Sequence, residues 1–154
     1  MSSSRFAAVY DAILTTLRND ANLSSSVISD GLPITEDRLT SLVMVGNSGD
    51  AEDTLAGSVR QSYHDMAGKS STRDETITIN CAVMTQTGDV DVSATRSAAF
   101  TVLGYVEAAL RANYSLGLAE VMRVELVDVQ CYIEQFADGT AVRLPFQVVA
   151  TCLI

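Results

Sequence analysis

The C-terminal stretch Val121–Ile154 decides the fold, and it reads VMRVELVDVQCYIEQ, then FADG, then TAVRLPFQVVATCLI. In both long runs apolar residues alternate with polar ones, a period of two that is typical of β-strands with one buried face. The dipeptide Asp138-Gly139 between them favours a tight turn joining antiparallel strands. The sequence therefore predicts a long β-hairpin with strands over 121–135 and 140–154.

The two faces of this hairpin differ in character. One face of the second strand is apolar throughout. Its residues are Val142, Leu144, Phe146, Val148, Ala150 and Cys152. In the first strand the apolar parity shifts, which predicts a bulge or twist near Leu126. The opposite face carries Arg123, Glu125, Arg143 and Gln147. These four side chains either form a solvated face with cross-strand charge pairs or belong to a subunit interface. The apolar ending Ala150–Ile154 favours the interface, because free apolar strand ends are a liability in water.

Two helices and three further strands are expected upstream. Apolar residues recur at helical spacing from Ser4 to about Asn19, with Ser3 or Ser4 as N-cap. A second helix runs to about Ala112 from a cap at Asp91 or Ser93. The strongest upstream strand spans 75–86, and weaker ones span 39–45 and 59–66. This order predicts a single α+β domain over 1–154, a mostly antiparallel sheet with the two main helices packed on one face.

Composition narrows the class of function. The chain has 19 acidic residues against 10 Lys plus Arg, a net charge of -9, which repels nucleic-acid phosphates. We expect no specific DNA binding. No apolar run approaches the roughly 20 residues that span a bilayer, and the N-terminus lacks the layout of a signal peptide. The expectation is a protein that stays in the cytoplasm where it is made, without a membrane partner.

The residues give little support to a catalytic, cofactor or metal site. Cys81, Cys131 and Cys152 are widely spaced in apolar runs, so we interpret all three as reduced core residues. His64 is the sole histidine, and a neighbouring strand residue, Asp65, would point to the opposite face. A small enzyme using His64 remains an alternative, as does a monomeric ligand-binding domain. We predict no catalytic residue, no cofactor and no metal.

Two segments rich in polar residues and glycine, 46–57 and 68–74, are expected to be flexible loops. The first contains Asp50, Glu52 and Asp53, which could bind a hard cation but lack the spacing of a calcium-binding loop. We interpret them as a solvated acidic loop. The second contains Lys69 and Arg73. These five charged residues are candidates for contacts in an assembly, made as the loops become ordered.

Several short motifs, taken in order over residues 1 to 154, resemble the tail terminator proteins of long-tailed (siphovirus-type) bacteriophages, particularly phages of actinobacteria. The motifs are Leu42–Gly46 before the acidic loop, Gln61–Tyr63, Arg73–Glu75 entering the strand 76–82, Gly88-Asp89, Arg96, Val106–Ala112 with Leu116-Gly117, and the strand 142–150. The resemblance lies in their order, spacing and total length, since none is a chemical signature.

The resemblance implies a structural virion protein at the head-proximal end of the tail. Such a protein forms a hexameric ring on the last ring of the tail tube, stops tube polymerisation and joins the head-completion (neck) proteins. Its partners would be further copies of itself, the tail tube protein and the neck proteins, while DNA passes through the lumen. An acidic lumen, with Asp50, Glu52 and Asp53 facing it, would let DNA slide without sticking. Another neck ring subunit, such as a head-tail stopper or connector, is the nearest alternative.

Overall fold

The computed structural model describes residues 3–33, 40–63, 73–88 and 90–154. Two α-helices and seven strands make up most of it. They are α1 (Phe6–Arg18), β1 (Val27–Asp30), β2 (Ser41–Val45), β3 (Gly57–Tyr63), β4 (Arg73–Thr87), α2 (Val92–Ala112), β5 (Val121–Val127), β6 (Tyr132–Phe136) and β7 (Gly139–Leu153), with one turn of 3₁₀ helix at Ala21–Leu23. The α+β class and the C-terminal hairpin, β6–β7, are confirmed.

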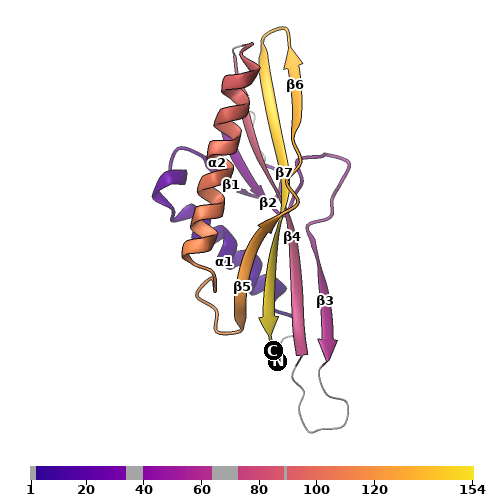
Figure 1. The fold of residues 1–154 in the computed structure, drawn as a ribbon. Coiled ribbons are helices and arrows are strands. Elements are labelled where there is room, and N and C mark those ends of the chain that lie inside the picture. The colour runs from indigo at the N-terminus through magenta and orange to yellow at the C-terminus, as the bar shows by residue number, and fades with distance from the viewer. Residues whose placement is uncertain (1–2, 34–39, 64–72, 89) are drawn as a thin grey trace.

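One mixed sheet organises the domain, and the antiparallel pair β4–β7 runs along its centre (Figure 1). Each of these strands is 15 residues long, so each edge of the pair takes two shorter partners. On the β4 side, β3 covers one half and β2 the other, with β1 parallel to β2 beyond it. On the β7 side, β5 covers one half and β6 the other. Both chain termini lie at the β3–β5 end (Figure 1).

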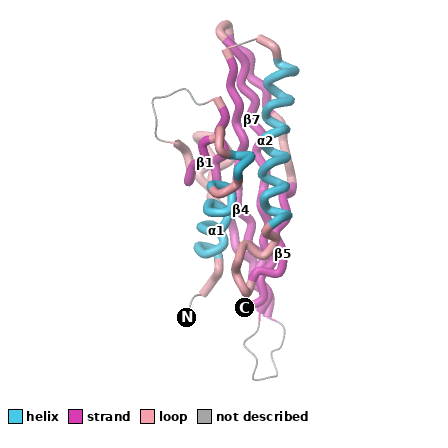
Figure 2. Tube along the Cα trace, turned by 90° about the vertical axis from the view of Figure 1, so that its left-hand side faces the viewer, coloured by secondary structure: helices cyan, strands magenta, loops and turns pink. Residues whose placement is uncertain are grey.

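The core lies between the helices and one face of the sheet. The inward residues of β7 are those predicted from the alternation, and all six are buried. From β4, Ile77, Ile79, Cys81 and Val83 join them. α1 contributes Val9, Ile13 and Leu17, and α2 contributes Ala99, Val106 and Leu110. α2 lies along the long strands for most of their length (Figure 2). Packing of both helices on one face is therefore confirmed, and no helix of the described residues lies over the opposite face.

The helix caps were predicted with mixed success. Asp91 is the N-cap of α2, and its side chain accepts a hydrogen bond from the Ala94 amide at 3.1 Å. For α1 the N-cap is Arg5, not Ser3 or Ser4. Ser4 Oγ instead accepts from the Phe6 amide at 3.0 Å and donates to Glu75, which is buried in the sheet. Ser4 therefore still accepts from the first backbone N–H of the helix, while its hydroxyl donates to the buried carboxylate.

The strand predicted over 121–135 is wrong as a single element. β5 ends at Val127, Asp128 adopts a left-handed φ of 54°, and pairing resumes only at β6. The bulge lies between Val121 and Arg123 and not near Leu126. Cys131, in the gap, is exposed, which corrects its assignment to the core.

Two further boundaries differ from expectation. Strand β1 was not predicted, because its four residues show no apolar alternation. Arg73 and Asp74, assigned to the second loop, are the first residues of β4. The rest of that predicted loop, with Lys69 and also His64, lies outside the described residues.

Candidate assembly surfaces

The face of the sheet opposite the helices, which we call the uncovered face, carries all four predicted interface residues. Arg143 pairs with Met84, and Gln147 pairs with Asn80. Arg123 and Glu125 of β5 pair with Thr151 and Val149 of β7. Because side chains on paired residues point to the same side of a sheet, the four lie on one face, as the alternation predicted.

Two of these four side chains make internal contacts. Arg143 Nη1 donates to the Ser48 carbonyl at 2.8 Å, and the guanidinium lies 4.4 Å from the centre of the Tyr132 ring. Gln147 Nε2 donates to Asn80 Oδ1 at 3.2 Å. Both side chains therefore help to organise the uncovered face itself.

Arg123 and Glu125 are different, because they lie on the edge strand and remain accessible. Their charged groups are 3.5 Å apart, and their side chains are 65% and 48% exposed. An exposed pair of this kind contributes at most about 1 kcal/mol to stability. Its charges are therefore free to be used in an intermolecular contact without a large loss of folding free energy.

The acidic loop between β2 and β3 folds back over the uncovered face. Gly46 and Gly49 have φ of 84° and 81°, which side-chain-bearing residues rarely adopt. Asn47 is buried, and its Oδ1 accepts from the Gly49 amide at 2.7 Å. At the far end of the loop, Asn80 Nδ2 donates to the Leu55 carbonyl at 3.0 Å. The loop is tied to the sheet at both ends, and flexibility of the part between stays a prediction.

Asp50, Glu52 and Asp53 lie in that middle part and are exposed. The Asp50 carboxylate accepts from the Glu52 amide at 3.0 Å, and the Asp53 carboxylate accepts from the Leu55 amide at 3.1 Å. These are local turn contacts that leave the remaining oxygens directed to solvent. Among the described residues, no three His, Cys, Asp or Glu side chains group closely enough to hold a metal ion.

Two shallow grooves mark the uncovered face. One, of about 630 Å³, lies between the acidic loop and the 128–130 segment, with Leu55, Asn80 and Gln147 among its lining residues. The other, of about 440 Å³, lies beside β6 and includes Glu134 and Arg143. Their mixed polar and apolar linings suit contact with a protein surface.

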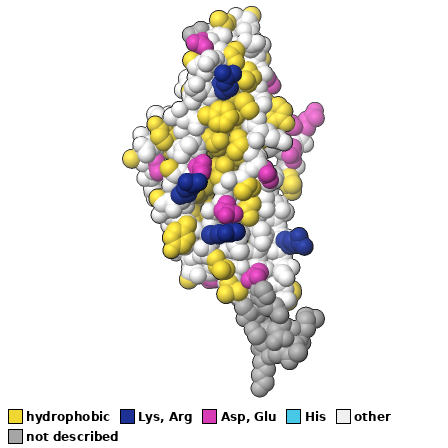
Figure 3. All heavy atoms as spheres, in the orientation of Figure 1, with side chains coloured by type: hydrophobic (Ala, Val, Ile, Leu, Met, Phe, Trp, Pro, Cys, Tyr) yellow, Lys and Arg dark blue, Asp and Glu magenta, His cyan; other side chains and the backbone are white. Residues whose placement is uncertain are grey.

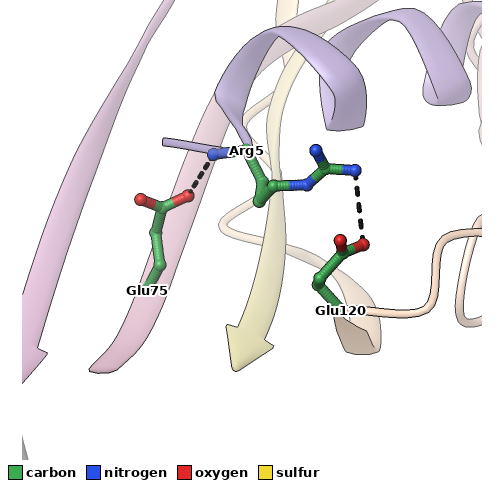
Figure 4. Close-up of polar contacts among 3 residues, drawn as sticks. All are labelled: Arg5, Glu75 and Glu120. Atoms are coloured by element: carbon green, nitrogen blue, oxygen red, sulfur yellow. Dashed lines mark hydrogen bonds and ion pairs between the residues drawn. The ribbon is translucent and has the colours of Figure 1, made fainter. Parts of the chain in front are cut away.

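A polar cluster at the β3–β5 end was not predicted from the sequence (Figure 4). Glu75 is fully buried and accepts hydrogen bonds from Ser4 Oγ at 3.0 Å, the Arg5 amide at 2.7 Å and Gln61 Nε2 at 2.6 Å. The Arg5 side chain points the other way, to Glu120, at 3.2 Å. The cluster ties the N-terminal segment to Gln61 of β3, to Glu75 of β4 and to Glu120, which directly precedes β5.

Arg73, a predicted contact residue, belongs to the same cluster. Its Nη2 donates to the Ser3 carbonyl at 2.8 Å, and its guanidinium lies 5.9 Å from the Tyr63 ring centre. Ser3 also accepts from Gln61 Nε2 at 2.8 Å. Arg73 therefore helps to anchor the N-terminal segment, a structural role that the sequence did not indicate.

Figure 3 shows one face of the molecule, and apolar side chains gather on the part of it near α2 and β6. All five residues of β6 are exposed. The exposed large hydrophobic residues on these elements and the segment before β6 are Phe100, Tyr105, Val129, Tyr132, Ile133 and Phe136. By their register with β7, Tyr132 and Phe136 lie on the uncovered face and Ile133 lies on the helix face, so β6 exposes apolar side chains on both of its faces. Exposed apolar residues on an edge strand are a feature of interaction sites, since edges facing water usually carry charges or proline.

Among the described residues, three buried or partly buried titratable groups have raised pKa values. Burial raises the pKa of the Cys81 thiol to about 12, and burial together with the charge of Glu75 raises the pKa of Cys152 to about 11. Burial, and then the hydrogen bond to Asp30 at 2.6 Å, also raises the pKa of Tyr10. Both thiols remain protonated at neutral pH, so neither is an activated nucleophile.

Comparisons with known proteins give matches among solved structures only. No protein-family model matches the sequence, and no curated protein matches it significantly. Among solved structures, a chain of the virion of a native gene transfer agent particle superimposes with a TM-score of 0.61. The identity is 19%, and the match covers 97% of this chain and 99% of that one. The two chains share a fold. None of the described helices could cross a membrane.

Proposed function

We propose that this chain is a structural subunit of a bacteriophage tail, and specifically a tail terminator. The observation that carries the proposal is the end-to-end similarity in fold to a chain of a virion particle, with 97% and 99% coverage. A match that includes nearly all of both chains means that the similarity in fold extends over the whole domain and is not limited to a shared substructure. The ordered motifs that resemble terminators of long-tailed phages point to the same role.

In this role the chain acts through binding geometry, without catalysis. A ring of subunits, hexameric by the resemblance, caps the last ring of the tail tube. Growth stops because the face turned away from the tube does not offer the docking surface of a tube subunit, so further tube subunits are excluded. The face turned away from the tube also binds the head-completion proteins. Several weak subunit contacts act together around such a ring, which gives strong attachment without a large individual interface.

The acidic loop has a place in this proposal. With the uncovered face directed to the lumen, Asp50, Glu52 and Asp53 would repel the phosphates of passing DNA. The three carboxylates are exposed, which supports the assignment. A variant with all three charges reversed should eject DNA more slowly at low salt. Ejection at the normal rate would count against a lumenal position.

The decisive experiment is to locate the chain in the virion. Particles made without it should carry tails of irregular length or lack joined heads, and imaging of intact particles should place the chain in one ring between tube and neck. A position in a different neck ring would identify a stopper or connector subunit instead. Absence of the chain from purified particles would refute the proposal altogether.

A further inference from the structure

Among the described strands, β3 and β5 each pair on one side only, so each leaves one edge without a strand partner. β3 pairs with β4 over residues 73–79, and β5 pairs with β7 over residues 147–152. These stretches of β4 and β7 face each other, so β3, β4, β7 and β5 lie side by side (Figure 1). Each neighbouring pair is antiparallel, so β3 and β5 run in opposite directions. Both strands have seven residues.

The backbone groups of β3 that point to solvent follow from the pairing with β4. Along an antiparallel strand, the N–H and C=O of successive residues point alternately to either side. Asn80 N–H donates to the Ala56 carbonyl at 2.9 Å, in the same register as the β3–β4 ladder. Every second residue after Ala56 is therefore bonded to β4. The amides and carbonyls of Val59 and Gln61 point away, to the free edge.

The same reasoning fixes the free groups of β5. Leu153 N–H donates to the Glu120 carbonyl at 2.9 Å. The backbone N–H and C=O groups of Leu153 and of every second residue before it therefore point toward β5. One of these is Val149, whose partner is Glu125. The backbone N–H and C=O of Glu125 are thus hydrogen-bonded to β7, and those of its two sequence neighbours point to the other side. The residues of β5 with outward backbone groups are therefore Val124 and Leu126.

We propose that β3 of one copy pairs with β5 of the next copy, antiparallel, with Val59 opposite Leu126 and Gln61 opposite Val124. This register joins outward groups to outward groups at both positions. The pairing of β3 with β5 names the contact that would build the ring, and this proposal rests on the proposed function. The contact uses two different edges of each subunit, so it is head-to-tail and does not stop at a two-fold dimer. It builds a ring when the rotation between successive copies closes.

Side chains match in the same register on both faces of the sheet. On the uncovered face, the exposed Arg60 comes opposite Glu125, whose side chain is 48% exposed. Ser62 comes opposite Arg123, so no like charges meet. Paired residues on adjacent strands place opposite charges within reach, and each such pair contributes up to about 1 kcal/mol.

On the helix face the match is apolar. Val59 is 40% exposed and pairs with Ile77, so its side chain lies on the helix side. In the proposed register it enters a groove of about 450 Å³ between α2 and β5, lined in part by Leu110, Val124 and Leu126. Burial there removes an exposed valine from water and covers the free edge of β5.

Cross-linking tests this pairing directly. Arg60 and Glu125 would form a pair without direct backbone hydrogen bonds, with Cα atoms about 4.5 Å apart, which a disulfide can bridge. A chain carrying Arg60→Cys and Glu125→Cys, with Cys131→Ser to remove the exposed thiol, should give a ladder of reducible oligomers on mild oxidation. The matched control carries Arg60→Cys with Arg123→Cys, a diagonal pair about 7 Å apart. It should cross-link at least about tenfold more slowly, because that separation is outside the disulfide range.

Charge reversal gives an independent readout. Arg60→Glu or Glu125→Arg alone should raise the concentration needed for assembly by about fivefold per contact, the equivalent of about 1 kcal/mol. The double reversal should restore assembly. Oligomers by light scattering without the ladder, or without rescue by the double reversal, would overturn the edge pairing and leave the ring proposal intact. A chain that stays monomeric at every concentration and with tail tube present would overturn both.

Discussion

The buried carboxylate of Glu75 provides the sharpest test of how the N-terminal segment is held. Glu75→Gln keeps the shape of the side chain but replaces one acceptor oxygen with an NH₂ donor. That donor must face either the Arg5 amide or Gln61 Nε2, both of which already donate to Glu75. Gln61 can flip to present its carbonyl, but it then loses its bond to the Ser3 carbonyl. Either arrangement removes at least one hydrogen bond to a charged group, which lowers the free energy of unfolding by about 1.5–3 kcal/mol.

Glu120→Gln is the matched control, because Glu120 contacts the same Arg5 from a position that is 37% exposed. Its loss should lower the free energy of unfolding by less than about 1 kcal/mol. Urea unfolding followed by far-ultraviolet circular dichroism measures both values, and the chain has no tryptophan to follow by fluorescence. The slope of the transition should be unchanged. Equal losses for the two variants would show that burial of Glu75 does not strengthen its hydrogen bonds, and the reasoning would fail.

Three further outcomes are expected. Leu144→Ala, at a fully buried position, should lower the free energy of unfolding by about 2–5 kcal/mol, whereas Ile133→Ala on exposed β6 should change it far less; urea titration compares them. Iodoacetamide should modify Cys131 in the folded chain and reach Cys81 and Cys152 only after unfolding, as peptide mass spectrometry would show. Burial raises the pKa of the Cys81 thiol from 9.0 to about 12. As the pH rises, the unfolded chain therefore loses the thiol proton at a lower pH than the folded chain. Cys81 therefore adds stability below pH 9 that is lost progressively up to about pH 12, and urea unfolding of wild type and Cys81→Ala across that range would reveal it.

The central sheet could be predicted because its strands obey a simple rule. β4 and β7 lie against the helices on one face only, so most of their residues alternate between buried and half-exposed positions. β1 could not be found in this way, because its central residues, Ile28 and Ser29, are both half-buried. A short parallel strand beside another short strand leaves no periodic signal.

The polar cluster illustrates what periodicity cannot reveal. Glu75 occupies an inward position of β4, where the alternation predicts an apolar residue. Its burial is tolerated because Ser4 and Arg5, some 70 residues away in sequence, bring donors to it. No local sequence pattern predicts this contact, because it forms only when the N-terminal segment packs against β3 and β4 in the folded chain. The four residues of the uncovered face were found because strand parity alone determines their side of the sheet.

The failed prediction around Cys131 has a physical interpretation of its own. Val127, Val129, Cys131 and Ile133 alternate as a strand with one buried face would, yet Val129, Cys131 and Ile133 are exposed in the isolated chain. Selection for solubility would replace such residues with charged ones if this edge always faced water. An alternation without a partner in the monomer is what is expected of a segment that is buried only when subunits meet. We therefore expect β6 and the segment before it to be buried in an assembly, next to the edge that β5 is proposed to offer to a neighbouring copy.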